Sequence, residues 1–294
     1  MIEKKEDQLV VGIPKGSLQE ATVDLFGRAG YQVRVPSRSY IPEIDDSTMS
    51  AVMFRAQEMS RYVEDGVVDM GITGHDWIVE NGSDVVEVCE LLYSKATSKP
   101  ARWVLAVPEE SGYDSVKDLE GKIIATELPE TTKRFFESQG VKAKVEFSWG
   151  ATEVKARLVD GIVDVTETGS SLRANKLKVL AELMSSTTRL IANKDAWANP
   201  WKRQKIEDLA LLLQGAIAAK SKVGLKMNVT RDTLNDVLKL LPSEQSPTVN
   251  ELADQQWVAI EVVVETKIER ELVPQLSRAG AKAIFSYPLN KVIP

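Results

Sequence analysis

The stretch Asp164-Val-Thr-Glu-Thr-Gly-Ser-Ser-Leu172 decides the fold that the sequence predicts. The β-branched run before it, residues 162–165, predicts a strand. The segment after it, residues 172–180, predicts a helix, with apolar residues at Leu172, Leu177 and Leu180. A strand–loop–helix brings backbone N–H groups and hydroxyls to a helix N-terminus, where unpaired donors and the helix dipole attract anions. The stretch therefore predicts an anion-binding loop.

The composition of this loop suggests a ligand that carries both phosphate and hydroxyl groups. Gly169 lets the backbone approach a phosphate closely and adopt a φ that other residues resist. Asp164 and Glu167 would repel a phosphate, but their carboxylates can accept hydrogen bonds from a ribose diol. An ordinary helix cap, with Ser170 or Ser171 satisfying the first turn, remains the alternative because short motifs often mislead.

Length and composition indicate a globular chain of two or three domains. The chain has 294 residues, of which 43% are hydrophobic. No apolar run approaches the ~20 residues that cross a bilayer, and the charged N-terminus lacks the apolar core of a signal peptide. A single cysteine, Cys89, excludes an intramolecular disulfide framework and fits a reducing compartment. We therefore expect a cytoplasmic protein with no membrane partner.

The charge and the single histidine exclude several classes of site. A net charge of −6 argues against a broad nucleic-acid surface, which would carry a basic patch. A phosphate ligand must then be held by local donors or accompanied by a cation. One histidine, His75, excludes multi-histidine metal sites, and its loop position suggests a surface or supporting residue. Cys89 lies in an apolar run, which predicts a buried and inert thiol.

Three further strand-to-helix turns in the first third of the chain carry polar residues. Each follows an apolar run that predicts a strand: Lys15 after residues 9–14, Arg55 after 50–54, and Gly74 and Asp76 after 67–73. Lys15 could neutralise a pyrophosphate as a point charge. A solvated surface charge is the alternative for Lys15, Arg55 and Asp76 alike.

The order of elements predicts two α/β lobes. Glycine-punctuated strand and helix patterns recur between residues 102 and 159, and such alternation favours parallel sheets with right-handed crossovers. A further strand over residues 188–193 can return the chain to the first lobe. Two lobes joined by two crossings leave a cleft where strand ends meet, and ligands bind at such places.

The last quarter of the chain predicts a separate small domain. After a long amphipathic helix over residues 205–220, strands and helices follow in the order β-α-β-β-α-β, with Thr230 placed to cap the first helix. This order is the ferredoxin-like split βαβ pattern. An appended domain of this kind suits the sensing of a small ligand.

Several stretches along the chain form a recognisable set. They are Pro14-Lys-Gly16, residues 62–76, the loop of residues 164–172 with Arg173-Ala-Asn175, residues 189–193, Ser246-Pro-Thr248, Trp257-Val-Ala259 and residues 280–284. Together they resemble the long, regulated form of the ATP phosphoribosyltransferase family of histidine biosynthesis. The resemblance covers nearly the whole chain. It implies an α/β fold of two periplasmic-binding-protein-like lobes that form a catalytic cleft, followed by a ferredoxin-like (ACT-like) regulatory domain. The implied boundaries are residues 1–102 with 190–221 for lobe I, 103–189 for lobe II and 222–294 for the histidine-binding domain.

The resemblance also implies an activity. The phosphoribosyl group of phosphoribosyl pyrophosphate would pass to N1 of ATP and release pyrophosphate, with Mg²⁺ held mainly by substrate phosphates and with no certain protein ligand. Histidine would act as inhibitor, and family members assemble as dimers and hexamers. The implied roles are Asp164 and Glu167 on the ribose; Thr168, Gly169, Ser170 and Ser171 on the 5-phosphate; Lys15 and Arg55 near the polyphosphates; Gly74 and Asp76 in substrate binding; and Asn228, Thr248 and Ala283 around the effector.

The sequence departs from the family pattern in three places. Ser17 stands where the family usually has an arginine, and Ser171 stands where it usually has threonine. The connection over residues 158–161 is about two residues shorter than the common form. Ser171 keeps the hydroxyl, whereas Ser17 removes a cation. Two alternatives therefore stay open: a catalytically inactive regulatory subunit, and a small-molecule-binding protein of the same fold.

Overall fold

The chain is described here as a computed structural model that covers residues 7–36, 39–93, 100–242 and 246–293. It divides into two compact units. The first unit contains residues 1–27 and 31–210, and the second contains residues 28–30 and 211–294. The division falls within helix α8 (Pro200–Ala219).

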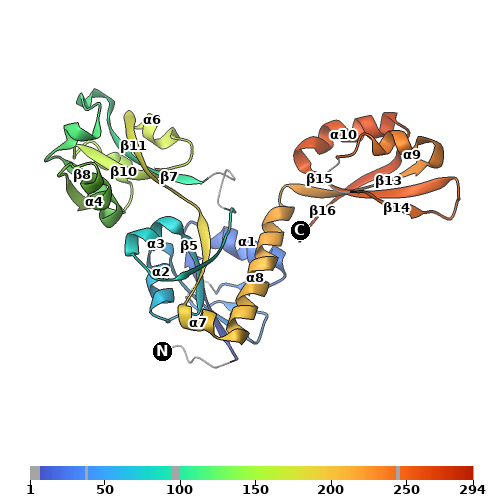
Figure 1. The fold of residues 1–294 in the computed structure, drawn as a ribbon, viewed down its shortest axis with the longest axis horizontal. Coiled ribbons are helices and arrows are strands. Elements are labelled where there is room, and N and C mark those ends of the chain that lie inside the picture. The colour runs from blue at the N-terminus through green and yellow to red at the C-terminus, as the bar shows by residue number, and fades with distance from the viewer. Residues whose placement is uncertain (1–6, 37–38, 94–99, 243–245, 294) are drawn as a thin grey trace. The chain divides into compact units, whose positions relative to one another are not determined.

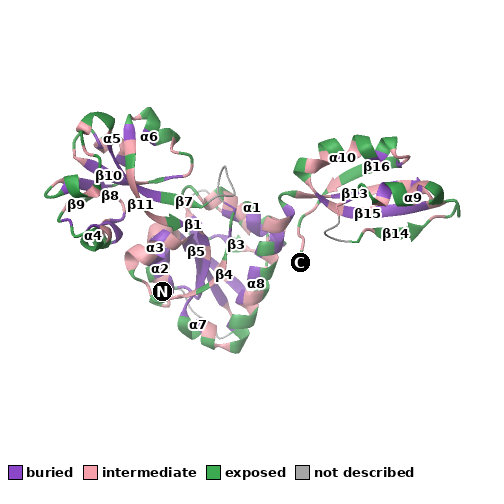
Figure 2. Cartoon of the chain, turned by 45° about the horizontal axis from the view of Figure 1, so that its top comes forward, coloured by how far each residue is buried: buried purple, intermediate pink, exposed green. Residues whose placement is uncertain are grey.

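The first lobe of unit 1 is a five-stranded sheet in the order β4-β1-β5-β12-β6, and helices flank it (Figure 1). Its elements are β1 (Leu9–Lys15), α1 (Gln19–Ala29), β4 (Met49–Arg55), α2 (Ala56–Glu64), β5 (Met70–Gly74), α3 (His75–Asn81), β6 (Val86–Glu90), β12 (Thr188–Ala192) and α7 (Lys194–Ala198), with a small pair of β2 (Val33–Arg34) and β3 (Glu43–Ile44). The side chains of β1 are buried up to Pro14, as a strand covered on both faces requires (Figure 2).

The second lobe of unit 1 is a five-stranded sheet in the order β11-β7-β10-β8-β9. Its elements are β7 (Ala101–Pro108), the 3₁₀ turns η1 (Glu109–Ser111) and η2 (Val116–Leu119), β8 (Ile123–Thr126), α4 (Pro129–Ser138), β9 (Lys144–Phe147), α5 (Thr152–Lys155), β10 (Gly161–Thr166), α6 (Ser170–Ala174) and β11 (Leu177–Ser186). One core cluster of this lobe includes Trp103, Leu105, Phe136 and Val163.

The expectation of parallel sheets is only partly correct. Strands β1, β4 and β5 run parallel, as do β8, β9 and β10. Strand β7 is antiparallel to β10 and β11, and β12 is antiparallel to β5 and β6. The apolar pattern of a buried strand is the same in either direction, so it does not specify the direction of pairing. The return of the chain to the first lobe through β12 is confirmed.

The helix predicted over residues 172–180 is wrong beyond Ala174. Helix α6 ends at Ala174, and Lys176 then adopts a left-handed φ of 55°. Leu177 begins β11, which pairs with β7 along its whole length. The pairing is irregular between Val179 and Ala181 and again between Glu182 and Met184, so the apolar residues of this strand do not alternate cleanly.

The second unit contains a four-stranded antiparallel sheet in the order β14-β15-β13-β16. Its elements are β13 (Lys222–Thr230), α9 (Arg231–Leu238), β14 (Thr248–Glu251), β15 (Trp257–Glu265), α10 (Thr266–Arg278) and β16 (Lys282–Pro288). Figure 1 shows α9 and α10 on one side of this sheet. Thr230 holds the N-cap position of α9, but its hydroxyl pairs with the Thr233 hydroxyl at 3.0 Å.

The predicted fold class is confirmed: the chain is α/β, with two lobes and a ferredoxin-like third sheet. The β-α-β-β-α-β order and the strand order of the second unit are those of the split βαβ arrangement. No helix among the described residues is long and apolar enough to cross a bilayer.

Candidate active-site cleft

The parallel strands of the first lobe bring three predicted site residues to one edge of the sheet. Lys15 ends β1 and Arg55 ends β4, and the two are direct partners in the parallel register. Gly74 ends β5, the neighbour of β1 on its other side. The carboxyl ends of parallel strands are where open α/β sheets bind ligands. The edge therefore gathers two cations and a close-approach glycine.

This edge faces a cavity of about 660 Å³, here called the main cleft. Residues of both lobes line it, since Glu167 follows β10 and Ser186 ends β11. Among the residues predicted from the sequence, it is lined by Lys15, Arg55, Gly74, Asp76 and Glu167. The cleft is therefore large enough for a nucleotide-sized ligand and combines positive and acceptor groups.

The cations that line the main cleft among the described residues are Lys15 and Arg55. The Lys15 ammonium lies 3.5 Å from the centroid of the Tyr40 ring. A hydrogen bond with Lys15, together with its charge, lowers the pKa of the Tyr40 hydroxyl. Ser17 also lines the cleft. It stands where the family usually has an arginine, so this part of the wall carries a hydroxyl in place of a positive charge.

Asp76 is fixed by contacts with the strands that connect the lobes. Its Oδ2 accepts a hydrogen bond from the indole N–H of Trp103 in β7 at 2.7 Å, and its backbone N–H donates to Ser186 Oγ of β11 at 3.1 Å. Oδ1 accepts from the Trp77 N–H at 3.0 Å. The side chain is buried, and this burial raises the pKa of its carboxyl group. A Cβ on Gly74 would lie 2.0 Å from Oδ1, so this tight turn requires glycine.

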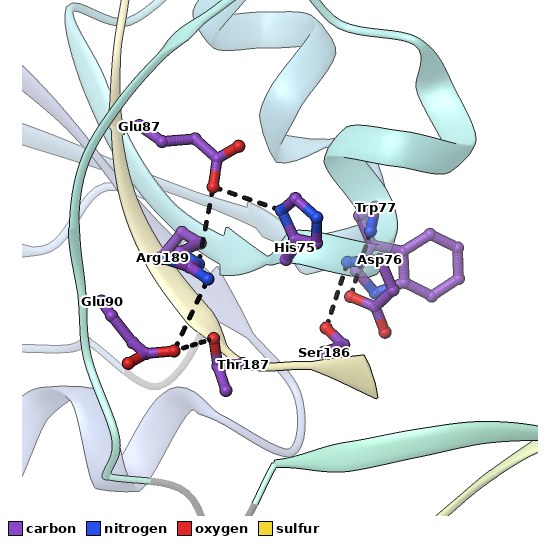
Figure 3. A network of polar contacts seen from close by, with 8 residues as sticks. All are labelled: His75, Asp76, Trp77, Glu87, Glu90, Ser186, Thr187 and Arg189. Carbon is purple, nitrogen blue, oxygen red and sulfur yellow. Dashed lines mark hydrogen bonds and ion pairs between the residues drawn. The ribbon is translucent and has the colours of Figure 1, made fainter. Parts of the chain in front are cut away.

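A charged network lies beside Asp76 (Figure 3). His75 Nδ1 is 3.2 Å from a Glu87 oxygen, and Arg189 pairs with both Glu87 and Glu90 at 3.5 Å. His75 is therefore part of an ion-pair network, which agrees with the supporting role predicted from the sequence. Burial raises the pKa of the Cys89 thiol to about 11, so it stays protonated and is no nucleophile at neutral pH.

The loop before α6 has the backbone that an anion-binding turn requires. Gly169 adopts φ 72°, and its N–H donates to Thr166 Oγ1 at 2.8 Å. Thr168 Oγ1 donates to Ser170 Oγ at 3.0 Å, and both side chains are exposed. Ser171 Oγ donates to Glu153 at 2.9 Å. Asp164 and residues 168–171 are not among those that line the main cleft, whereas Glu167 is.

Asp164 belongs to a group of carboxylates that the sequence alone did not reveal. Burial is the main cause that raises its pKa to about 6, and the charges of Glu153 and Glu127 raise it further. Glu127 follows β8, which pairs in parallel with β10. The pairing of β8 with β10 was the missing information, because it brings the two carboxyl ends together.

The three predicted effector residues lie in the second unit. In β13, Leu225, Met227 and Val229 point into the core, so Asn228 lies on the face away from the helices. Asn228 pairs with Ala259 of β15, and Thr248 pairs with Glu261 of the same strand. Because Ala259 and Glu261 are two residues apart, Thr248 and Asn228 lie on the same face of the sheet. Ala283 has a left-handed φ of 48°, next to Lys282, the partner of Asn228.

Among the described residues, no group of three or more His, Cys, Asp or Glu side chains has the geometry of a metal site. A metal ion at this site would therefore need ligands from a bound substrate. Magnesium commonly binds in that way, through phosphate oxygens and water.

Comparison with known proteins identifies the family. The ATP phosphoribosyltransferase model matches residues 55–215, and the model described as "HisG, C-terminal domain" matches residues 219–291. An ATP phosphoribosyltransferase of Chlorobaculum parvum is 58% identical over 286 residues, 97% of both chains. One of Thermodesulfovibrio yellowstonii is 56% identical over 291 residues, 99% of this chain and 100% of that one.

A solved structure, the ATP phosphoribosyl transferase (HisG:HisZ) complex from Thermotoga maritima, has a chain that is 28% identical with a TM-score of 0.60. The match covers 70% of the present chain and 99% of that chain. Together with the two matching family models and the near full-length relatives, this establishes that the chain belongs to the ATP phosphoribosyltransferase family, in the long form that carries a C-terminal domain.

Proposed function

We propose that this protein transfers the 5-phosphoribosyl group of phosphoribosyl pyrophosphate to N1 of ATP, giving phosphoribosyl-ATP and pyrophosphate as the first step of histidine biosynthesis. The observation that carries the proposal is the near full-length identity to named ATP phosphoribosyltransferases. The main cleft supports it, because residues from both lobes combine two cations with carboxylates in a space of nucleotide size. The enzyme is a pentosyltransferase.

The first-lobe cations would bind the polyphosphates. Lys15 and Arg55 end paired strands, so their charges lie side by side at the edge of the cleft. As pyrophosphate leaves C1 of the ribose, negative charge develops on its oxygens, and fixed cations stabilise that charge. Adenine N1 is already a nucleophile, so the reaction needs alignment of the substrates more than a strong base.

The second lobe would hold the sugar phosphate. The exposed hydroxyls of Thr168 and Ser170 and the N–H groups that open α6 suit the 5-phosphate. Asp164 and Glu167 suit the ribose hydroxyls as acceptors. Positive charge builds on the ribose as the leaving group departs, by analogy with glycoside chemistry, and nearby carboxylates favour that charge.

The described residues fit Mg²⁺ only as a partner of the substrates. No carboxylate cluster among them could hold the ion alone. Bound to the phosphates, Mg²⁺ would supply the positive charge that a chain of net charge −6 lacks. The chain's own part would be to position those phosphates through Lys15 and Arg55.

The second unit would supply feedback control by histidine. Asn228 offers an amide and Thr248 a hydroxyl on the sheet face away from the helices, and both groups suit a small zwitterion. An effector acts at a distance only if it binds two global states differently, so regulation should involve subunit or lobe arrangement. The proposal includes a homo-oligomer, as dimers or hexamers, in the cytoplasm.

Turnover separates this function from the two alternatives, the inactive regulatory subunit and the binding protein. Purified protein with ATP, phosphoribosyl pyrophosphate and Mg²⁺ should form phosphoribosyl-ATP, which ultraviolet absorbance reports because alkylation at N1 changes the adenine chromophore. Chelation of Mg²⁺ should abolish the signal, and its return on adding Mg²⁺ is the control. Absence of turnover under these conditions would support the regulatory subunit, whose motivation is the missing cation at Ser17.

Replacement of Thr248 by Phe tests the effector site. The bulky ring should raise the histidine concentration for half-inhibition at least about tenfold, because a lost hydrogen bond and a steric block together exceed 1.4 kcal/mol. Turnover without histidine should stay close to that of the wild type, since Thr248 is exposed in the second unit. Strict competition between histidine and phosphoribosyl pyrophosphate would instead place the effector in the main cleft.

A further inference from the structure

A second cavity of about 630 Å³ has no role in the function proposed above. Residues of α2 and α3 in the first lobe line it, together with Glu127, Pro129, Phe147, Ser148 and Trp149 of the second lobe. We call it the aromatic pocket. It shares Arg55, Gln57, Glu58 and Trp77 with the main cleft, so the two spaces adjoin.

Trp149 is the most unusual residue of this pocket. Its side chain is 89% exposed, although an indole gains greatly from burial. Isolated exposed apolar residues are common, but an exposed tryptophan on the wall of a cavity with a second exposed aromatic beside it marks a binding surface. That second residue is Phe147, which is 50% exposed.

The backbone on both sides of Trp149 is held in place, so its exposure does not come from a loose loop. Ser148 is fully buried, and its hydroxyl contacts Thr152 Oγ1 at 2.9 Å and accepts from Lys155 Nζ at 2.7 Å. Gly150 and Ala151 follow with φ of 95° and 48°, and a left-handed alanine persists only where its surroundings impose it. The indole is therefore presented by a structured turn.

The two aromatic rings leave room for a third. Phe147 and Trp149 meet edge to face, with centroids 4.8 Å apart and planes at 83°. In this geometry the partner covers at most one of the four ring faces. A flat heteroaromatic ligand can stack on an open face, and base–aromatic stacking tolerates any base.

The polar groups of the pocket match the edge of an amino-substituted base. Glu127 is partly buried and hydrogen-bonded by the Gln57 side chain, and burial raises the pKa of its carboxyl group. It can accept a hydrogen bond from an exocyclic amine. Glu80 is already occupied, since its two oxygens accept from the N–H groups of Glu130 and Thr131. Glu127 is therefore the better acceptor for a ligand.

We propose that the aromatic pocket takes the adenine of ATP, with Trp149 stacked on the base and Glu127 accepting from its amino group. The inference rests on the proposed function, in which adenine is the only flat heteroaromatic group of the substrates. Arg55 lines both spaces, so the phosphates of the same nucleotide can lie in the main cleft. Trp149 is then a specificity residue for the nucleotide substrate.

Kinetics of Trp149→Ala test the stacking. The KM for ATP should rise about tenfold or more, while the KM for phosphoribosyl pyrophosphate changes less than about threefold. Trp149→Phe should recover most of the affinity. The matched control is Trp201→Ala, which removes another exposed indole of the same unit that lines neither cavity. Thermal unfolding should be unchanged in the Trp149 variants because the side chain packs on little. An unchanged KM for ATP in Trp149→Ala overturns the inference.

Binding without turnover gives a second measurement. The chain has six tryptophans, so the difference between wild type and Trp149→Phe isolates the signal of one of them. Titration with ATP should quench the fluorescence of the wild type and of Trp201→Ala, with clearly weaker quenching in Trp149→Phe, in which Trp77 of the same pocket remains. Equal quenching in Trp149→Phe overturns the inference. If the wild type shows no turnover, the proposed function fails, while this titration still decides where adenine binds.

Discussion

Gly169→Val is expected to lower kcat/KM for phosphoribosyl pyrophosphate about 100- to 1,000-fold, because misplacing a phosphate cradle removes both alignment and charge stabilisation. Gly169 has φ 72°, and an added Cβ would lie 2.9 Å from Nη1 of Arg173. The arginine can move, but it donates to the Thr168 carbonyl within the same loop at 3.1 Å. A β-branched residue also resists a left-handed φ. The valine therefore disturbs the loop twice.

Gly112→Val is a closely matched control for backbone strain. Gly112 has φ 73° and ψ 2°, against φ 72° and ψ 7° for Gly169, and it lies in the same lobe. An added Cβ meets nothing within 4 Å at Gly112. Both variants should lose similar stability, by thermal unfolding, and only Gly169→Val should lose activity. Equal activity in the two variants would mean that the loop around Gly169 is an ordinary helix cap and does not bind the phosphate.

The sequence predicted the elements that carry the site better than it predicted their pairing. Strands β1, β4, β5 and β10 were expected from apolar runs, because a buried strand needs such a run whatever it pairs with. Placement of Lys15 and Arg55 at strand ends followed from the same runs. The direction of β7 and β12 did not follow, since antiparallel and parallel buried strands share one apolar pattern.

The errors have a common physical cause: tertiary contacts determine the secondary structure and the burial of short segments. Leu177 and Leu180 suggested a helix, but a left-handed Lys176 ends α6 and the following residues form β11, which pairs with β7. The burial of Asp76 against Trp103 joins residues 27 positions apart and has no local signal. Trp149 was not singled out because its exposure becomes unusual only once the pocket beside it is known.

Asp164→Asn is expected to reduce kcat/KM about 10- to 100-fold and at the same time to stabilise the fold at neutral pH. The loss of activity follows from weaker acceptance of the ribose hydroxyls, since a hydrogen bond to a charged group contributes about 1.5–3 kcal/mol. The gain in stability follows from burial, which raises the pKa of Asp164 to about 6. An asparagine of the same shape removes the buried charge.

The dependence on pH gives the sign of this stability effect. The ordinary pKa of aspartate is 3.8, so between pH 4 and 6 the folded chain keeps a proton that the unfolded chain has lost. Wild-type stability therefore falls as pH rises through this window, and the penalty is fully present above pH 6. We expect about 1–2 kcal/mol at pH 7.5, after allowance for partial exposure. Chemical unfolding of both proteins at pH 4 and 7.5 should show a gap only at the higher pH.

Asp160→Asn should change stability in the opposite direction and thereby exclude a general effect of removing negative charge from an acidic chain. Asp160 begins the turn into β10, four residues from Asp164. Its carboxylate accepts from the Ile123 N–H and the Tyr113 hydroxyl, both at 2.9 Å, and these bonds and Lys122 lower its pKa. The stability that it contributes is present above pH 4 and is lost as pH falls through its lowered pKa. Destabilisation by Asp160→Asn beside stabilisation by Asp164→Asn, with loss of activity in the second alone, is the result that a ribose-binding role for Asp164 requires. If both variants stabilised the fold and kept full activity, Asp164 would have no part in binding the ribose.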